Sequence, residues 1–210
     1  QVMKQSVPSW AIPYTKPAQA PAAPRSPSDL GGDKVLPGGT PQDAENSKRL
    51  GTAVHRLLEV LPNAPQDQWG HIAQRLVEAD IQAAAFQEAH AVLQQPELAY
   101  IFAPESLAEV DISAHLPELN GDPIQGSIDR LLISPTRVLA VDFKSNQIVP
   151  SEVAQVPSGL LRQMGAYAAA LSQIYPHHDI ETAILWTKTL ELMPLPPDLV
   201  ISSLANTSPA

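Results

Sequence analysis

The chain has no cysteine among its 210 residues. Disulfide bonds, zinc sites built on thiolates, cysteine-held iron–sulfur clusters and thiol nucleophiles are therefore excluded. Without disulfides, the compartment we expect is the cytoplasm.

Basic charge and long apolar runs are also scarce. Lys and Arg number 13 against 22 Asp and Glu, which gives a net charge of -9 and argues against a broad basic surface for nucleic acid. No apolar run approaches the roughly 20 residues that cross a bilayer, and the first residues lack a signal-peptide pattern. We therefore expect a soluble protein without a membrane partner, in which any contact with DNA is local or assisted.

Two common enzyme motifs are missing. The sequence contains neither a G-x-x-x-x-G-K-[ST] phosphate loop nor a G-x-S-x-G nucleophile elbow. Any ATP hydrolysis would therefore belong to another part of a longer protein, and a metal site is the only coherent chemistry left.

Proline is concentrated at the front of the chain. Eight of the 22 prolines precede residue 42, and residues 1–46 show neither helical nor strand periodicity. This composition predicts a linker or extended arm over residues 1–46 and a folded domain over residues 47–210. Such a spacer suggests a downstream domain of a longer protein, and Trp10 and Tyr14 are candidate anchors within it.

The rest of the chain changes its hydrophobic period at residue 106. Helical spacing precedes that point, and alternation with turn signals follows it. The expected helices span residues 47–61, 66–85, 86–95 and 158–175, and the expected strands span residues 107–116, 123–133, 138–144 and 181–189, with a final strand or short element after residue 195. The first three strands form a meander, and the fold class is mixed α/β.

The hairpin between the second and third strands carries the most informative pattern. If its turn is centred on Pro135 and Thr136, facing residues have numbers that sum to 271, so Asp129 faces Asp142. Two carboxylates ~4.5–5.5 Å apart at Cβ repel each other unless a cation neutralises them. Lys144 projects from the same face of its strand as Asp142.

This set of residues suits phosphodiester hydrolysis. Mg²⁺ and Mn²⁺ prefer carboxylate oxygens, and a nearby ammonium can orient a water molecule or stabilise the transition state. The alternative is an exposed hairpin whose Asp and Lys form surface ion pairs. The pairing alone does not decide between the two.

Three ordered motifs resemble a known family. They are Gly126-Ser127-Ile128-Asp129-Arg130, Val141-Asp142-Phe143-Lys144 and Gln163-Met164-Gly165-Ala166-Tyr167. Together they resemble the RecB-like branch of the PD-(D/E)XK nuclease superfamily, and within it the nuclease domains of AddA-type helicase–nucleases, over residues 51–196. The resemblance implies a restriction-endonuclease-like α/β core, with a mixed central sheet flanked by helices and an N-terminal helical region.

The resemblance also implies a role for particular residues. Asp129, Asp142 and Lys144 would be catalytic, and a Mg²⁺ ion, for which Mn²⁺ can substitute, would be held by His55, Asp129, Asp142 and the backbone carbonyl of Phe143. Accessory roles would fall to Glu109, Gln163 and Tyr167, the last two positioning the lysine or the DNA strand. Arg130 and Arg162 would contact DNA, and Arg137 is a further candidate.

The expected activity is that of a bacterial DNA exonuclease that helps resect double-strand breaks for recombinational repair. It would cut single strands delivered by a helicase and work with an AddB-like partner subunit. One alternative is a nuclease-like module that binds DNA or a partner without cutting. Another, a stand-alone phage or CRISPR-associated nuclease, is disfavoured because those relatives often carry four cysteines for an iron–sulfur cluster, and this chain has none.

Overall fold

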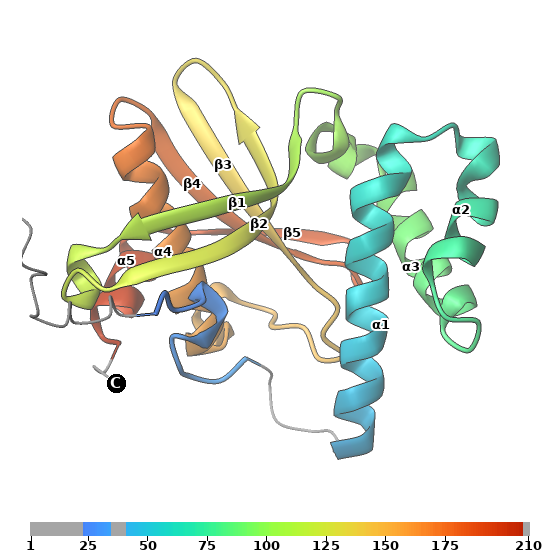
Figure 1. Ribbon diagram of the computed structural model, residues 1–210, viewed down its shortest axis with the longest axis horizontal. Coiled ribbons are helices and arrows are strands. Elements are labelled where there is room, and N and C mark those ends of the chain that lie inside the picture. The colour runs from blue at the N-terminus through green and yellow to red at the C-terminus, as the bar shows by residue number, and fades with distance from the viewer. Residues whose placement is uncertain (1–22, 35–40, 208–210) are drawn as a thin grey trace, which may run out of the picture.

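The computed structural model describes residues 23–34 and 41–207. Its main elements begin with three helices, three strands, a helix and a strand, in the order that the sequence predicts (Figure 1). The helices are α1 (Pro41–Val60), α2 (Trp69–Leu76), α3 (Gln82–Gln94), α4 (Ser158–Ile174) and α5 (Pro197–Ala205). The strands are β1 (Leu107–His115), β2 (Pro123–Ile133), β3 (Arg137–Lys144), β4 (Asp179–Trp186) and β5 (Glu191–Leu195).

The strands form one five-stranded sheet in the order β1-β2-β3-β4-β5. The first three are antiparallel neighbours, which confirms the predicted meander, whereas β3 and β4 are parallel. Parallel neighbours need a crossover, and α4 supplies it between β3 and β4. β5 then returns antiparallel to β4.

The sheet is covered on both faces. Along β3, Val138 and Ala140 pack with α4 and α5, while Leu139, Val141 and Phe143 pack with α1, α2 and α3. Alternate residues of a strand point to opposite faces, so a strand buried on both sides reads as a continuous apolar run. Figure 1 shows the two groups of helices on opposite sides of the sheet. This architecture confirms the predicted mixed α/β fold with an N-terminal helical region.

The helical region differs from its prediction in two places. α1 begins at Pro41 rather than at residue 47, and the break between the next helices lies at Val77–Ile81 rather than after residue 85. Val77 leaves α2 in an extended conformation and buries its side chain, while Arg49 of α1 pairs with Glu78 and Asp80 of the turn. Tertiary contacts thus make this turn, and neither glycine nor proline marks it.

The end of the chain also differs in part. β4 covers Asp179–Trp186 and ends before the predicted residue 189, because a turn to β5 begins there. The sequence did not reveal β5, and the tail after residue 195 forms the helix α5. Within the described residues, none of the helices has both the length and the apolar character of a membrane span.

Part of the proline-rich front packs on the folded core. The amide of Arg25 donates to Pro123 O (2.9 Å), and Arg25 O accepts from the amide of Gln125 (3.0 Å), along the edge of β2. Pro27 and Leu30 are buried. The boundary at residue 46 stays a prediction, although residues 23–34 contact the sheet and α4. The suggested anchors Trp10 and Tyr14 lie outside the described residues.

Gly165→Ala tests the contact between α4 and α5. A Cβ at Gly165 would meet the backbone carbonyl oxygen of Val200 and lie 2.9 Å from Leu204 Cβ. We expect a loss of about 1–3 kcal/mol from overpacking, which outweighs the roughly 1 kcal/mol that alanine gains over glycine in a helix. Thermal unfolding measures it. Gly70→Ala in α2 is the matched control, because a Cβ there meets nothing within 4 Å, and a higher Tm for Gly165→Ala would contradict the packing.

Candidate active site

The candidate site lies where β2 and β3 separate. The paired residues run from Ile133↔Val138 to Arg130↔Val141. In each pair the two residue numbers sum to 271, which confirms the predicted register. Asp129 and Asp142 come next, at the point where this ladder ends. The amide of Phe143 there donates to Asp129 Oδ2 at 2.5 Å, so a carboxylate takes the place of a backbone acceptor. We call this point the fork, defined by Asp129 of β2 and by Asp142 and Lys144 of β3.

Glu109 extends the row of acids into β1. The pairs Ala108↔Arg130 and Val110↔Ile128 bracket it, so the register sets Glu109 opposite Asp129. Its φ of 48 is left-handed, a conformation that costs a non-glycine residue about 1–3 kcal/mol and that clusters at functional sites. Ligand atoms of Glu109, Asp129 and His55 all lie within 4.8 Å of one another.

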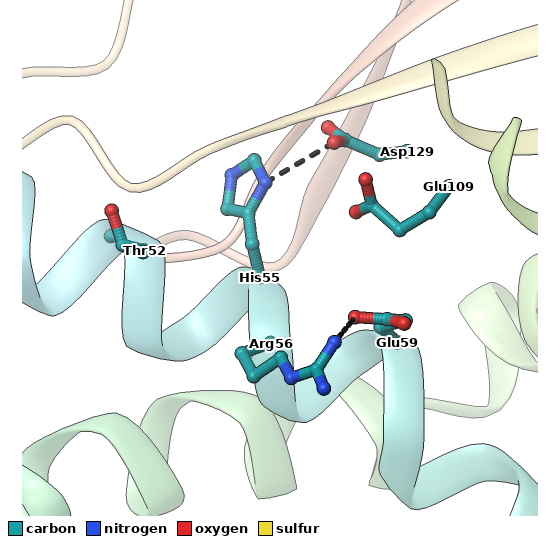
Figure 2. A pocket seen from close by; sticks show the side chains of 7 residues that line it. Thr52, His55, Arg56, Glu59, Glu109 and Asp129 are labelled. Atoms are coloured by element: carbon teal, nitrogen blue, oxygen red, sulfur yellow. Dashed lines mark hydrogen bonds and ion pairs between the residues drawn. The ribbon is translucent and has the colours of Figure 1, made fainter. Parts of the chain in front are cut away.

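His55 reaches this row from α1. Its Nδ1 lies 3.2 Å from Asp129 Oδ1, and its ring meets the ring of Phe143 edge-on at 5.6 Å between centroids. Figure 2 shows the imidazole directed at Asp129, with Glu109 beside that carboxylate. An open pocket runs along α1 at this point and is lined by Gly51, Thr52, His55, Arg56, Glu59, Glu109 and Asp129.

Asp142 is held from the opposite layer. Gln163 of α4 donates from Nε2 to Asp142 Oδ1 at 2.7 Å, and the ammonium of Lys144 pairs with Asp142 Oδ2. Gln163 Nε2 also donates to the hydroxyl of Tyr167 (3.1 Å), which donates to Ser127 O (2.6 Å). The i, i+4 pair on α4 therefore positions Asp142 and ties α4 to β2.

The model of the PD-(D/E)XK nuclease superfamily matches residues 32–192 of the chain. The chain belongs to this superfamily. No curated protein matches the chain. Members of the superfamily are generally hydrolytic nucleases that use divalent metals.

Electrostatics at the fork distinguish the two aspartates. Burial opposes the charged forms of both Asp129 and His55, but their mutual hydrogen bond and attraction dominate. They hold the pKa of Asp129 below its usual value and raise the pKa of His55. This half of the candidate site is a paired carboxylate and imidazole.

The protein supplies too little positive charge to neutralise the other two acids, Asp142 and Glu109. Burial, and then the nearby Asp129 carboxylate, raise the pKa of Asp142 in spite of Lys144. Partial burial of the Glu109 carboxyl, and then the negative charge of Asp129, raise the pKa of Glu109. A divalent cation is the neutralising charge that fits three carboxylates and one imidazole. The residues present therefore suit the metal that the superfamily uses.

The structure places the predicted residues in two neighbouring groups. His55, Asp129 and Glu109 form one trio, while Asp142 joins Lys144 and Gln163 across the fork. Four pocket residues on α1 were missed, namely Gly51, Thr52, Arg56 and Glu59. The sequence signal was present for Gly51, Thr52 and Glu59, because they lie three or four residues from His55 and so share its side of the helix. Arg56 follows His55 directly and has no such spacing.

The arginines predicted to contact DNA lie elsewhere. Arg130 is only 2% exposed, its Nη2 donates to Leu58 O at 2.7 Å, and its guanidinium lies 5.2 Å from the ring centre of Phe102. It is inside the protein and not available to a phosphate, which corrects that prediction. Arg162 is half-buried, with Nη1 3.5 Å from Leu30 O, and its DNA contact stays a prediction. Arg137 pairs with Glu181 at the far end of β3.

Divalent cations should stabilise the folded chain. At a Mn²⁺ concentration about 100 times its Kd, selective binding to the native state adds about 2.7 kcal/mol, or roughly 5–10 °C in Tm for a domain of this size. Asp129→Asn should abolish this shift in a thermal melt, because it removes one of the charged oxygens. His71→Gln, an exposed histidine away from the fork, is the control, and an equal Tm shift in all three proteins would disprove the site.

Proposed function

We propose that this chain is a Mg²⁺-dependent DNA nuclease that hydrolyses phosphodiester bonds as an exonuclease. The observation that carries the proposal is the meeting of Asp129, Asp142 and Lys144 at the fork with His55 of α1 beside them. Membership of a nuclease superfamily supports the same reaction.

The metal ligands we assign are His55, Asp129, Asp142 and the backbone carbonyl of Phe143, with Glu109 in an accessory role. The support is the closeness of ligand atoms of His55, Asp129 and Glu109, and the hydrogen bond from the amide of Phe143, the residue after Asp142, to Asp129. When bound there, Mg²⁺ or Mn²⁺ supplies Lewis acidity to a phosphoryl oxygen and acidifies a water molecule.

Lys144 supplies the positive charge that belongs to the protein itself. Its ammonium lies at Asp142, and its side chain is 20% exposed, so it is anchored inside the fork yet open to a substrate. An ammonium fixed at that point stabilises the negative charge that develops on the phosphoryl group and orients the attacking water. Gln163 and Tyr167 keep the Asp142 carboxylate in place for both tasks.

The substrate we assign is single-stranded DNA delivered by a helicase. A net charge of -9 gives the chain little bulk attraction for DNA, whereas a tether to a DNA-bound motor raises the local concentration of substrate. The motifs resemble AddA-type nuclease domains, so the proposed setting is resection of double-strand breaks with an AddB-like partner subunit.

Cleavage of labelled single-stranded DNA with Mg²⁺ tests the proposed reaction. We expect Asp142→Asn and Lys144→Met to lower kcat by about 10³-fold or more, because each removes several kcal/mol of charge stabilisation from the transition state. EDTA should abolish cutting. Lys144→Met should keep the Mn²⁺-dependent rise in Tm, since it removes no metal ligand.

The chain should also be assayed joined to a helicase motor. Cutting only in the joined form would support delivery of the strand by the motor. If folded protein that binds Mn²⁺ cuts in neither form, the enzyme assignment is wrong and the module that binds without cutting takes its place.

A further inference from the structure

A buried acid outside the fork connects the helical layer to the catalytic lysine. Glu88 lies on α3, and its side chain is only 6% exposed. It faces the turn after β4, where Thr187 is 1% exposed. The nuclease chemistry proposed above makes no direct use of either residue.

Glu88 is held from this turn by one hydrogen bond and one ion pair. The hydroxyl of Thr187 donates to Glu88 Oε1 at 2.5 Å, and the ammonium of Lys188 lies 2.6 Å from Glu88 Oε2. Burying a carboxylate is costly, and these partners offset the cost. An apolar residue at position 88 would fill the same space in α3 without the cost of burying a carboxylate. We therefore expect the charge of Glu88 to have a role other than packing.

Thr187 in turn holds the backbone of Lys144. Its amide donates to Lys144 O at 3.0 Å, just beyond the last β3–β4 pair, Lys144↔Trp186. The Thr187 hydroxyl is also 3.2 Å from that carbonyl. A hydroxyl has one proton to donate, and the shorter contact assigns it to Glu88. The carbonyl of Lys144 therefore depends on the Thr187 amide, whose place depends on Glu88.

We propose that Glu88 is a positioning residue for the nuclease reaction: acting through Thr187, it fixes the end of β3 and so sets where Lys144 places its ammonium. This inference rests on the proposed function of Lys144. β3 ends at Lys144, and no further β3–β4 pair follows. Without the anchor, the strand end and its side chain are free to shift relative to Asp142.

The same helical layer serves both sides of the fork. α1 brings His55 to Asp129, and α3, which packs on α1, brings Glu88 to the turn that holds Lys144. The ring of Phe143, the residue before Lys144, meets the ring of His55 edge-on, with 5.6 Å between the ring centroids. Loss of the Glu88 anchor should therefore affect the lysine while leaving the metal ligands in place.

Single-turnover and steady-state cleavage by the helicase-joined chain test this role. A displacement of about 1 Å can lower a rate by about 10²-fold, so we expect Glu88→Ala and Thr187→Val to lower kcat by about 10-fold to 100-fold. KM for DNA and the Mn²⁺-dependent Tm shift should stay near wild type. Glu88→Gln and Thr187→Ser should restore most of the rate, because each keeps the contact between the side chain of residue 88 and the hydroxyl of residue 187.

Val92→Ala separates positioning from stability. Val92 lies on the same helix, is fully buried and belongs to the same apolar core as α1 and β3, so its truncation should lower Tm without touching the anchor. Measured where every variant is folded, its kcat should equal wild type. If Val92→Ala lowers kcat as much as Glu88→Ala, or if Glu88→Gln fails to rescue, the positioning role is wrong.

Hydrogen exchange of the Thr187 amide gives a readout that needs no activity. Glu88→Ala should speed its exchange by about 10-fold or more through local opening, while the amides of Ala183 and Ile184 in the middle of β4 keep their protection. Unchanged exchange at Thr187 would overturn the anchor. If the wild type cuts no DNA but the exchange effect is present, the proposed reaction fails while the link from Glu88 to Lys144 stands.

Discussion

The separation of β2 from β3 is the constraint on which the site depends. Up to Arg130↔Val141 the two strands pair normally, and beyond that point their edges need other partners. Asp129 satisfies one edge by accepting the amide of Phe143. Asp129, Asp142 and Lys144 lie at this end of the ladder. Charged side chains can therefore meet inside a sheet that is covered on both faces.

Two layers of helices keep the fork in shape through polar contacts. Arg130 ties β2 to the carbonyl of Leu58 in α1, and Tyr167 ties β2 to α4 through the carbonyl of Ser127. Buried polar groups cost stability unless they are paired. Most of those around the fork have partners, and the acids that remain short of positive charge are Asp142 and Glu109, which we assign to the metal as a ligand and in an accessory role. The site thus trades stability for function, as functional sites commonly do.

The sequence was sufficient for the parts that depend on local periodicity and register. Alternation and turn signals predicted β1, β2 and β3, and the turn at Pro135 predicted the register of β2 and β3, whose last pair lies next to Asp129 and Asp142. Long-range contacts were out of its reach. The turn at Val77 is held by Arg49 of another helix. The left-handed φ of Glu109 could not be predicted, because the position is neither glycine nor asparagine, the residues that usually adopt this conformation. The position of Arg130 next to Asp129 suggested a contact with DNA. Because α1 lies beside it, the Arg130 side chain is instead buried and hydrogen-bonded to α1.

The division of labour between Glu109 and Asp142 was also beyond the sequence. Both are acids in strands that flank β2, and spacing alone treats them alike. Only the tertiary fold shows that Glu109 faces His55 and the pocket while Asp142 is held by Gln163 and Lys144. That difference gives the accessory acid an open environment and the proposed catalytic acid a buried one.

A crystal structure of the chain grown with Mn²⁺ tests the central claim most directly, because anomalous scattering locates the ion without reference to activity. The account predicts one strong anomalous peak at the fork, with His55, Asp129 and Asp142 as ligands and Asp142 still held by Gln163. An empty fork at saturating Mn²⁺, or an ion bound only at surface carboxylates, would contradict the assignment of these residues to a metal-dependent nuclease site.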